Sequence, residues 1–151
     1  MNPFHPWNPV THHPPTFVLD TSLPLEWYTK RMMSRYANDV FLKTAQSTVV
    51  VPTLWSNLLT EFLLLQLRGA RLTIRQVEAC ITGVLHFAIV IDNEGPARAW
   101  SDYLPIAQAF RVKLYDASYL ELALRRNLPL ATVDPALIRA ANAAGVPIFT
   151  P

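Results

Sequence analysis

Short apolar runs, several of them rich in β-branched residues, recur along this 151-residue chain, and each is followed by a segment with helical spacing. The runs are FVLD from Phe17, VVVP from Val49, AIVID from Ala88 and PLATVD from Pro129. Runs of this length that close on Asp or Pro are typical of buried parallel strands. Their alternation with helices predicts an α/β domain with a central, mostly parallel sheet of about four to five short strands, covered by helices on both faces.

Composition and length favour a single domain outside the membrane. The chain is 51% hydrophobic, enough for one buried core, and too short for two ordinary domains. We expect that domain over residues 16–151, preceded by a flexible arm rich in proline and histidine over residues 1–15. No segment has the roughly 18 uninterrupted apolar residues of a membrane span. The single cysteine, Cys80, is expected in the core and favours a reducing, cytoplasmic location.

Local signals place several helix ends. Thr73 and Gln76 form a capping box at the start of one predicted helix. A proline starts the helix predicted for residues 96–110, and Pro135 starts the last helix. Gly145 is expected to end that last helix, because glycine tolerates the left-handed backbone found there.

Three aspartates occupy positions where a parallel sheet binds ligands. Asp20 and Asp134 directly follow strand-like runs, and Asp116 opens a predicted helix. Each one alone is also well placed as a helix N-cap. However, the carboxyl ends of parallel strands converge at one edge, which would bring all three together. Clustered carboxylates repel one another unless a cation compensates, and an oxygen-only set favours Mg²⁺ or Mn²⁺ over zinc.

Glu61 lies on the helix predicted for residues 53–68, next to a stripe of apolar residues expected to be buried. The stripe consists of Leu54, Leu58, Phe62 and Leu65. Glu61 is about 60° around the helix from Leu58. Two interpretations remain open. Glu61 points toward the sheet edge and needs a metal, an arginine or a hydrogen-bond network, or it lies in solvent on the helix flank beside Asn57.

Three segments resemble the PIN-domain ribonucleases of the VapC toxin type. They are FVLDTSLPLEW, VPTLW and LYDASYLELALRRNLPLATVDPALIRAANAAGVPIF. The likeness runs in order from Thr16 to Phe149, and its last segment is the most specific. It implies a PIN-like fold and a Mg²⁺- or Mn²⁺-dependent endoribonuclease that is the toxin of a toxin–antitoxin pair. Such proteins are usually homodimers, act on RNA and are held inactive by a cognate antitoxin.

The resemblance also assigns site residues. Asp20, Asp116 and Asp134 match the acids that bind the metal, which lowers the pKa of a bound water and stabilises charge on the phosphate. Ser22 and Thr132 match hydroxyl positions that support the site through hydrogen bonds.

The chain departs from the family pattern at one position. The family carries a further acid three residues after the tryptophan of its P-x-L-W segment, and an amide three residues later. Here these positions are Leu58 and Glu61. One hypothesis is that Glu61 supplies the missing catalytic carboxylate from one turn away, about 4.5 Å along the helix. The alternative is a catalytically weak or inactive PIN-like module that binds a partner protein or RNA.

Two further interpretations concern basic residues. Several arginines are candidates for guiding the RNA backbone, although most arginines on an exposed helix face are simply solvated. They are Arg68, Arg71, Arg75, Arg125 and Arg126. A phosphate-receiving α/β domain is disfavoured, because it needs a lysine late in the chain and the last one, Lys113, precedes the strand that ends at Asp134.

Overall fold

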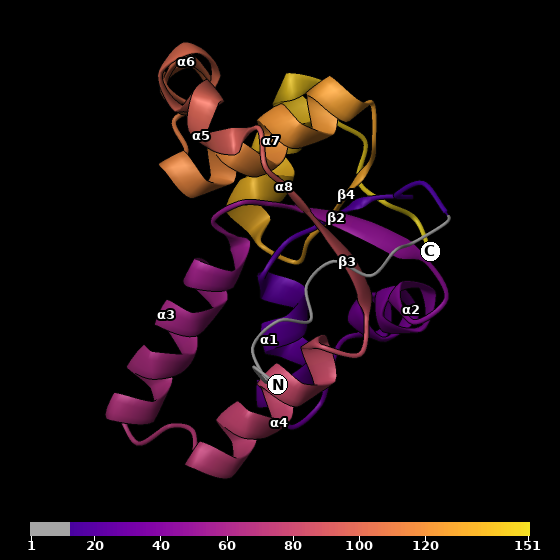
Figure 1. The fold of residues 1–151 in the computed structure, drawn as a ribbon, viewed down its shortest axis with the longest axis vertical. Helices are drawn as coiled ribbons and strands as arrows, with labels where there is room; N and C mark the ends of the chain where they lie inside the picture. The colour runs from indigo at the N-terminus through magenta and orange to yellow at the C-terminus, as the bar shows by residue number, and fades with distance from the viewer. Residues whose placement is uncertain (1–12) are drawn as a thin grey trace, which may run out of the picture.

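The structure, a computed structural model, describes residues 13–151 (Figure 1). The predicted arm over residues 1–15 therefore lies almost wholly outside the described residues. In chain order the elements are β1 Val18–Leu19, α1 Ser22–Thr29, α2 Arg35–Thr44, β2 Thr48–Pro52, α3 Trp55–Arg68, α4 Ile74–Val84, β3 Ala88–Asp92, α5 Gly95–Arg98, the π-helical turn η1 Ala99–Tyr103, α6 Leu104–Phe110, α7 Leu114–Arg126, β4 Leu130–Ala131 and α8 Pro135–Ala144.

The strands form a four-stranded sheet in the order β3-β2-β1-β4, and all neighbours are parallel. Val18 in β1 is paired with Val50 on one side and with Leu130 on the other. Near the C-terminus, Ile148 adds a single parallel bridge to Leu130. The predicted α/β class with a parallel sheet is confirmed, and the carboxyl ends of the strands lie along one edge.

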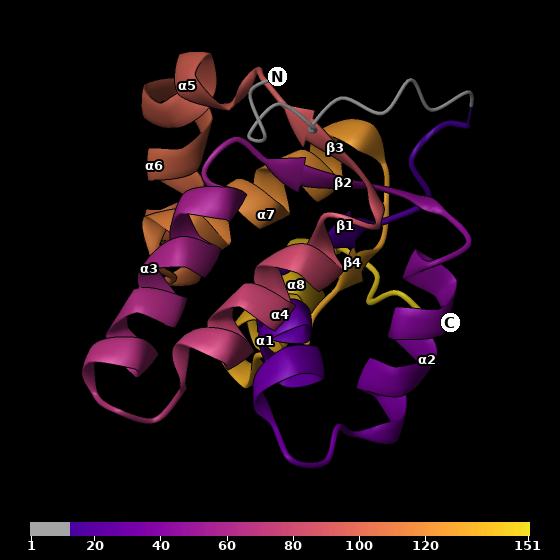
Figure 2. The same cartoon turned by 60° about the horizontal axis from the view of Figure 1, so that its bottom comes forward.

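Helices cover the sheet on both faces, as expected for a parallel sheet with crossover connections (Figures 1 and 2). On one face α7 packs against β1, β2 and β4. On the other face α1 packs against both α2 and α4. The longest helix, α3, extends away from the sheet and leans on α4.

Helix α7 runs through the centre of the molecule and positions part of the site. All its residues from Ala117 to Ala123 are buried. A helix that is buried on all sides is in contact with neighbouring elements all round, so packing against them fixes its direction in the molecule. The first turn of α7, with Asp116, therefore has a defined place at the carboxyl edge of the sheet.

The buried face of α3 differs from the predicted one. Trp55, Leu59 and Leu63 are the buried residues, while Leu54 and Phe62 are each 36% exposed and Leu65 is 52% exposed. The prediction was wrong because leucines occur on nearly every side of this helix. Their spacing alone does not indicate which side meets α4 and the sheet.

The helix ends predicted from local signals are confirmed, but one predicted helix is interrupted. The Thr73–Gln76 capping box is present, and Gly145 ends α8 with a φ of 74°. The helix predicted for residues 96–110 is divided by η1. Pro105 follows this wider turn and has no N–H for a helical hydrogen bond, which explains the interruption.

None of the helices described between residues 13 and 151 is both long enough and apolar enough to span a bilayer.

Candidate active site

Asp20 is held at the end of β1 by hydroxyl donors. Its side chain is almost fully buried, and its Oδ2 accepts hydrogen bonds from Ser22 Oγ at 2.5 Å and Thr132 Oγ1 at 2.7 Å. Thr21 Oγ1 donates to Oδ1 at 3.3 Å. Ser22 and Thr132, which the family resemblance placed in supporting positions, thus both contact the first acid. These donors fix the carboxylate without neutralising its charge.

Asp134 lies on the connection from β4 to α8, beside the same hydroxyls. Its backbone N–H donates to Thr132 Oγ1 at 3.0 Å, and Val133 N donates to Ser22 Oγ at 3.1 Å. The Asp134 side chain caps α8, because Oδ1 accepts from Ala136 N at 2.7 Å and Leu137 N at 3.1 Å. The N-cap interpretation therefore holds for Asp134, and Oδ2 has no hydrogen bond among the described residues.

Asp116 approaches from the first turn of α7 and is partly buried. One turn later Tyr119 is 1% exposed, and its hydroxyl accepts a hydrogen bond from Thr21 N at 3.3 Å, next to Asp20. Burial and the charge of Asp20 raise the pKa of Tyr119 well above its ordinary value, so the phenol stays protonated. Sequence analysis missed Tyr119, because nothing in its spacing indicates a contact with a strand end 98 residues earlier.

The three aspartates are coupled through their charges. Burial raises the pKa of Asp20; hydrogen bonds from Ser22 and Thr132 oppose the rise, and the charge of Asp134 adds to it. Burial also raises the pKa of Asp116, and the charges of Asp134 and Asp20 raise it further. The fold thus brings together side chains that are distant in the sequence, and none of the ion pairs formed within residues 13–151 neutralises them.

The donor chemistry of the cluster fits a hard divalent cation, but the cluster is not a complete cage. Among the described residues, no group of three or more His, Cys, Asp or Glu side chains is spaced to hold a metal ion. Mg²⁺ needs fewer protein ligands, because it is usually bound by one or two carboxylates and keeps waters or substrate phosphates as its other ligands. Asp20, Asp116 and Asp134 match that kind of site in donor chemistry, while their spacing does not form a three-ligand group.

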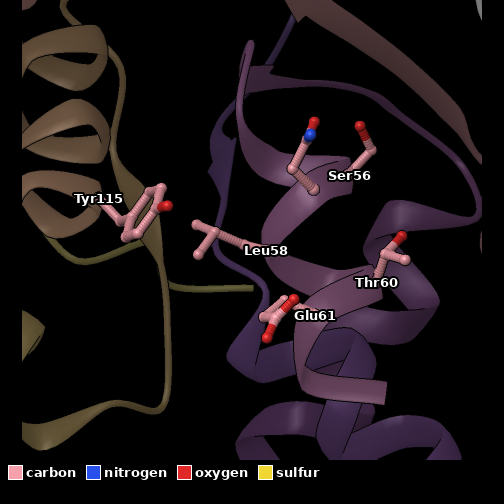
Figure 3. A pocket seen from close by; sticks show the side chains of 6 residues that line it. Ser56, Leu58, Thr60, Glu61 and Tyr115 are labelled. Atoms are coloured by element: carbon pink, nitrogen blue, oxygen red, sulfur yellow. The ribbon is translucent and has the colours of Figure 1, made fainter. Parts of the chain in front are cut away.

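Glu61 lies in solvent, so the second of the two sequence interpretations of its environment is confirmed. It lines a pocket of about 660 Å³ with Ser56, Asn57, Leu58, Thr60 and Tyr115. Figure 3 shows Leu58 of α3 and the Tyr115 ring of α7 pointing toward one another, with Glu61 one turn further along α3. The position where the family has an acid therefore presents an apolar side chain to the pocket.

A second group of charges at the same sheet edge is fully paired. Asp92 ends β3, its side chain is 1% exposed, and it contacts Arg125 at 2.7 Å and Arg126 at 2.8 Å. Arg125 also contacts Glu121 at 2.7 Å. The expectation that Arg125 and Arg126 contact RNA is therefore not supported, since these guanidinium groups bind carboxylates of their own chain.

The comparisons with known proteins show the fold alone. No model of a known protein family matches the chain, and no curated protein matches it in sequence. Among solved structures, PAE2754 from Pyrobaculum aerophilum has a similar fold, with a TM-score of 0.62 over 83% of this chain and 86% of that one. The two sequences are 17% identical, so the likeness concerns architecture and not activity.

Proposed function

We propose that the chain is a Mg²⁺- or Mn²⁺-dependent endoribonuclease of the PIN-domain, VapC type, the toxin of a toxin–antitoxin pair. The observation that carries this proposal is the group formed by Asp20, Asp116 and Asp134. Burial and the charge of Asp134 raise the pKa of Asp20, and burial and the charges of Asp134 and Asp20 raise the pKa of Asp116. Carboxylates that repel one another in this way, and that form no ion pair within residues 13–151, are what a catalytic metal site requires.

The chain's own residues have separate roles in this proposal. Asp20 is fixed by Ser22 and Thr132 and is the best-oriented ligand. Asp116 approaches from α7, and Asp134 offers the oxygen that α8 leaves free. A bound Mg²⁺ would lower the pKa of a coordinated water and stabilise the charge that develops on the phosphate. Glu61 remains the candidate for the further acid.

A second candidate function is a PIN-like module that binds RNA or a partner protein without cutting. The observation that favours it is Leu58, which faces the pocket where the family has a carboxylate. In this alternative the remaining aspartates bind metal too weakly for useful turnover.

Cleavage of a structured RNA with Mn²⁺ separates the two candidates. We expect the wild-type chain to cut RNA, EDTA to stop it, and Asp116→Asn to slow it at least about 100-fold, since even groups that only orient a metal ligand contribute about 10–100-fold. Asp39→Asn, which changes an exposed acid on α2, should leave the rate unchanged. Equal background cleavage by wild type and Asp116→Asn rejects the nuclease and leaves the binding module.

The family resemblance also underlies our proposals for partners and location. We infer a homodimer, a cognate antitoxin and a cytoplasmic location. Large apolar side chains on the surface support a protein partner, because a monomer rarely leaves many of them uncovered in one region. On η1 and α6, Trp100 is 83% exposed and Leu104 is 55% exposed.

A further inference from the structure

The pocket between α3 and α7 contains a slot with two apolar walls that the proposed metal chemistry does not use. One wall is Leu58, which is half-buried, and the other is the Tyr115 ring, which is 41% exposed (Figure 3). The pocket volume of about 660 Å³ falls within the range of about 300–1,000 Å³ typical of small-molecule sites.

Tyr115 exposes its aromatic ring at the first turn of α7, close in the chain to Asp116. It directly precedes Asp116 on the first turn of α7, so one wall of the slot is one residue away from an acid of the cluster, although none of the three aspartates lines the pocket. Its neighbour Tyr119, one turn along the same helix, is buried and hydrogen-bonded, whereas the Tyr115 ring lines the pocket. An aromatic ring exposed in this way is available for stacking.

We propose that the slot holds one unpaired nucleobase of single-stranded RNA, stacked on Tyr115 and covered by Leu58, next to the phosphate that is cut. The inference rests on the proposed function and names its substrate class. Stacking on aromatic side chains is the usual way in which proteins hold unpaired bases, because every base has a flat π-face. The uncharged side chain of Leu58 suits this role, since a carboxylate there would require desolvation against the base.

Polar groups around the slot fit the rest of a nucleotide. Asn57 lines the same pocket and offers an amide for the base edge, whereas the Ser56 side chain points away from Tyr115 (Figure 3). Lys113 is close enough to Asp116 for its charge to lower the pKa of that acid, so a cation is available for a neighbouring phosphate. A base-paired strand keeps its bases stacked inside the helix and has none to place in the slot.

Binding of short RNA, measured by fluorescence anisotropy in EDTA so that no cleavage occurs, tests the slot. The probes are a single-stranded oligoribonucleotide, the same strand annealed to its complement, and the same strand with one abasic residue. We expect wild type to prefer the single strand, and Tyr115→Ala to weaken its binding roughly 5- to 150-fold, the range measured for one stacked base. Tyr115→Phe keeps the ring and should bind like wild type.

The abasic strand supplies the decisive comparison. When the missing base is the one next to the cut, the abasic strand should bind wild type as weakly as the intact strand binds Tyr115→Ala. The abasic strand and the intact strand should bind Tyr115→Ala equally, because the ring that contacts the base is already absent. Leu42→Ala, which removes an exposed apolar side chain from α2, is the matched control. Thermal melting of each variant shows that it is folded.

The outcomes separate this inference from the proposed function. Equal binding by Tyr115→Ala and wild type overturns the slot, even if Mn²⁺-dependent cleavage occurs, and would leave the pocket to a side chain of a protein partner. Equal losses in Tyr115→Ala and Tyr115→Phe also overturn it, because the hydroxyl would then be the binding group. Stacking without cleavage by wild type supports the slot and rejects the nuclease.

Discussion

At the scale of single residues, two aspartates at one sheet edge show how neighbours decide the charge state of a carboxylate. Burial acts to raise the pKa of both Asp20 and Asp92, but the final pKa moves in opposite directions at the two residues. At Asp92, hydrogen bonds from Arg125 and Arg126 outweigh burial and hold the pKa below its usual value. At Asp20 the donors are hydroxyls, and the pKa remains raised. Only the Asp20 carboxylate therefore retains an uncompensated charge for an external cation.

Asp116 gives a pH-dependent prediction for the metal-free protein. Its pKa lies above the ordinary value of 3.8, so between 3.8 and the raised pKa the folded chain binds more protons than the unfolded chain. The free energy of unfolding therefore falls as pH rises through this window. We expect Asp116→Asn, which cannot ionise, to be more stable than wild type above the window.

Urea denaturation in EDTA at several pH values measures this effect. The difference in unfolding free energy between Asp116→Asn and wild type should shrink as pH falls toward 3.8. Acids outside the cluster titrate alike in both proteins and cancel in the difference. A difference that does not change with pH would contradict the raised pKa of Asp116, of which burial is the main cause.

Leu58 gives a second prediction at this scale. Under the proposed function, a carboxylate at this position would add a metal ligand where the PIN-domain nucleases that the sequence resembles carry one, so Leu58→Glu should bind Mn²⁺ more tightly than wild type. Isothermal titration with Mn²⁺ in the absence of RNA measures the affinity independently of the proposed base slot. Leu58→Gln, of similar size and uncharged, should show no gain, and a gain in both variants would count against ligation by the new carboxylate.

At the scale of elements, the ion pairs of Arg125 fasten the C-terminal part of α7 to the end of β3. Arg125 is 17% exposed and contacts the buried acids Asp92 and Glu121. Removing one partner of a buried ion pair costs about 3–5 kcal/mol, because the charge left behind is unpaired. We expect Arg125→Met to lower the free energy of unfolding by about 3 kcal/mol, the low end of that range, since Arg126 still pairs with Asp92.

A matched substitution tests whether burial is the reason. Arg35 and Asp39 form an exposed pair at 3.9 Å, with the arginine 96% exposed. Such pairs contribute about 0–1 kcal/mol, so Arg35→Met should change the unfolding free energy little. Similar losses in both variants, measured by urea denaturation, would show that the Arg125 pairs are not special.

Caps, strand ends and other features set by neighbouring residues were predictable from the sequence. Contacts between residues that are distant in the sequence were not. The capping box of Thr73 and Gln76 lies within one turn, and Asp20 and Asp134 come shortly after strands that the apolar runs already indicate. The buried face of α3 depends on where α4 packs against it. Because leucines occur on nearly every side of α3, the sequence does not indicate which side that is. The contacts of Arg125 with Asp92 join residues 33 apart, and neither residue has a sequence pattern that indicates the other.

At the scale of the whole molecule, the prediction concerns self-association. Trp100 is 83% exposed on η1, where its ring faces water with little else to cover it. If this region forms the proposed dimer contact, light scattering should give twice the mass of the chain for wild type, and Trp100→Glu should shift the equilibrium toward the monomer. A monomeric wild type at high concentration would reject the dimer without affecting the acid cluster.

The central position of α7 has a consequence for substitutions far from the site. The helix has 13 residues and is therefore about 20 Å long. Tyr115 and Asp116 lie in the first turn of α7 and Arg125 lies in its last turn. A change in the contacts of Arg125 can therefore tilt the helix and move Asp116. Asp116 lies nine residues before Arg125 on this helix, so a tilt of about 5° at Arg125 would move it by roughly 1 Å. Misplacement by about 1 Å can cost about 100-fold in the rate of an enzyme. If the proposed nuclease activity holds, substitutions of Arg125 or Arg126 should therefore reduce cleavage by displacing Asp116, although these arginines do not contact the RNA.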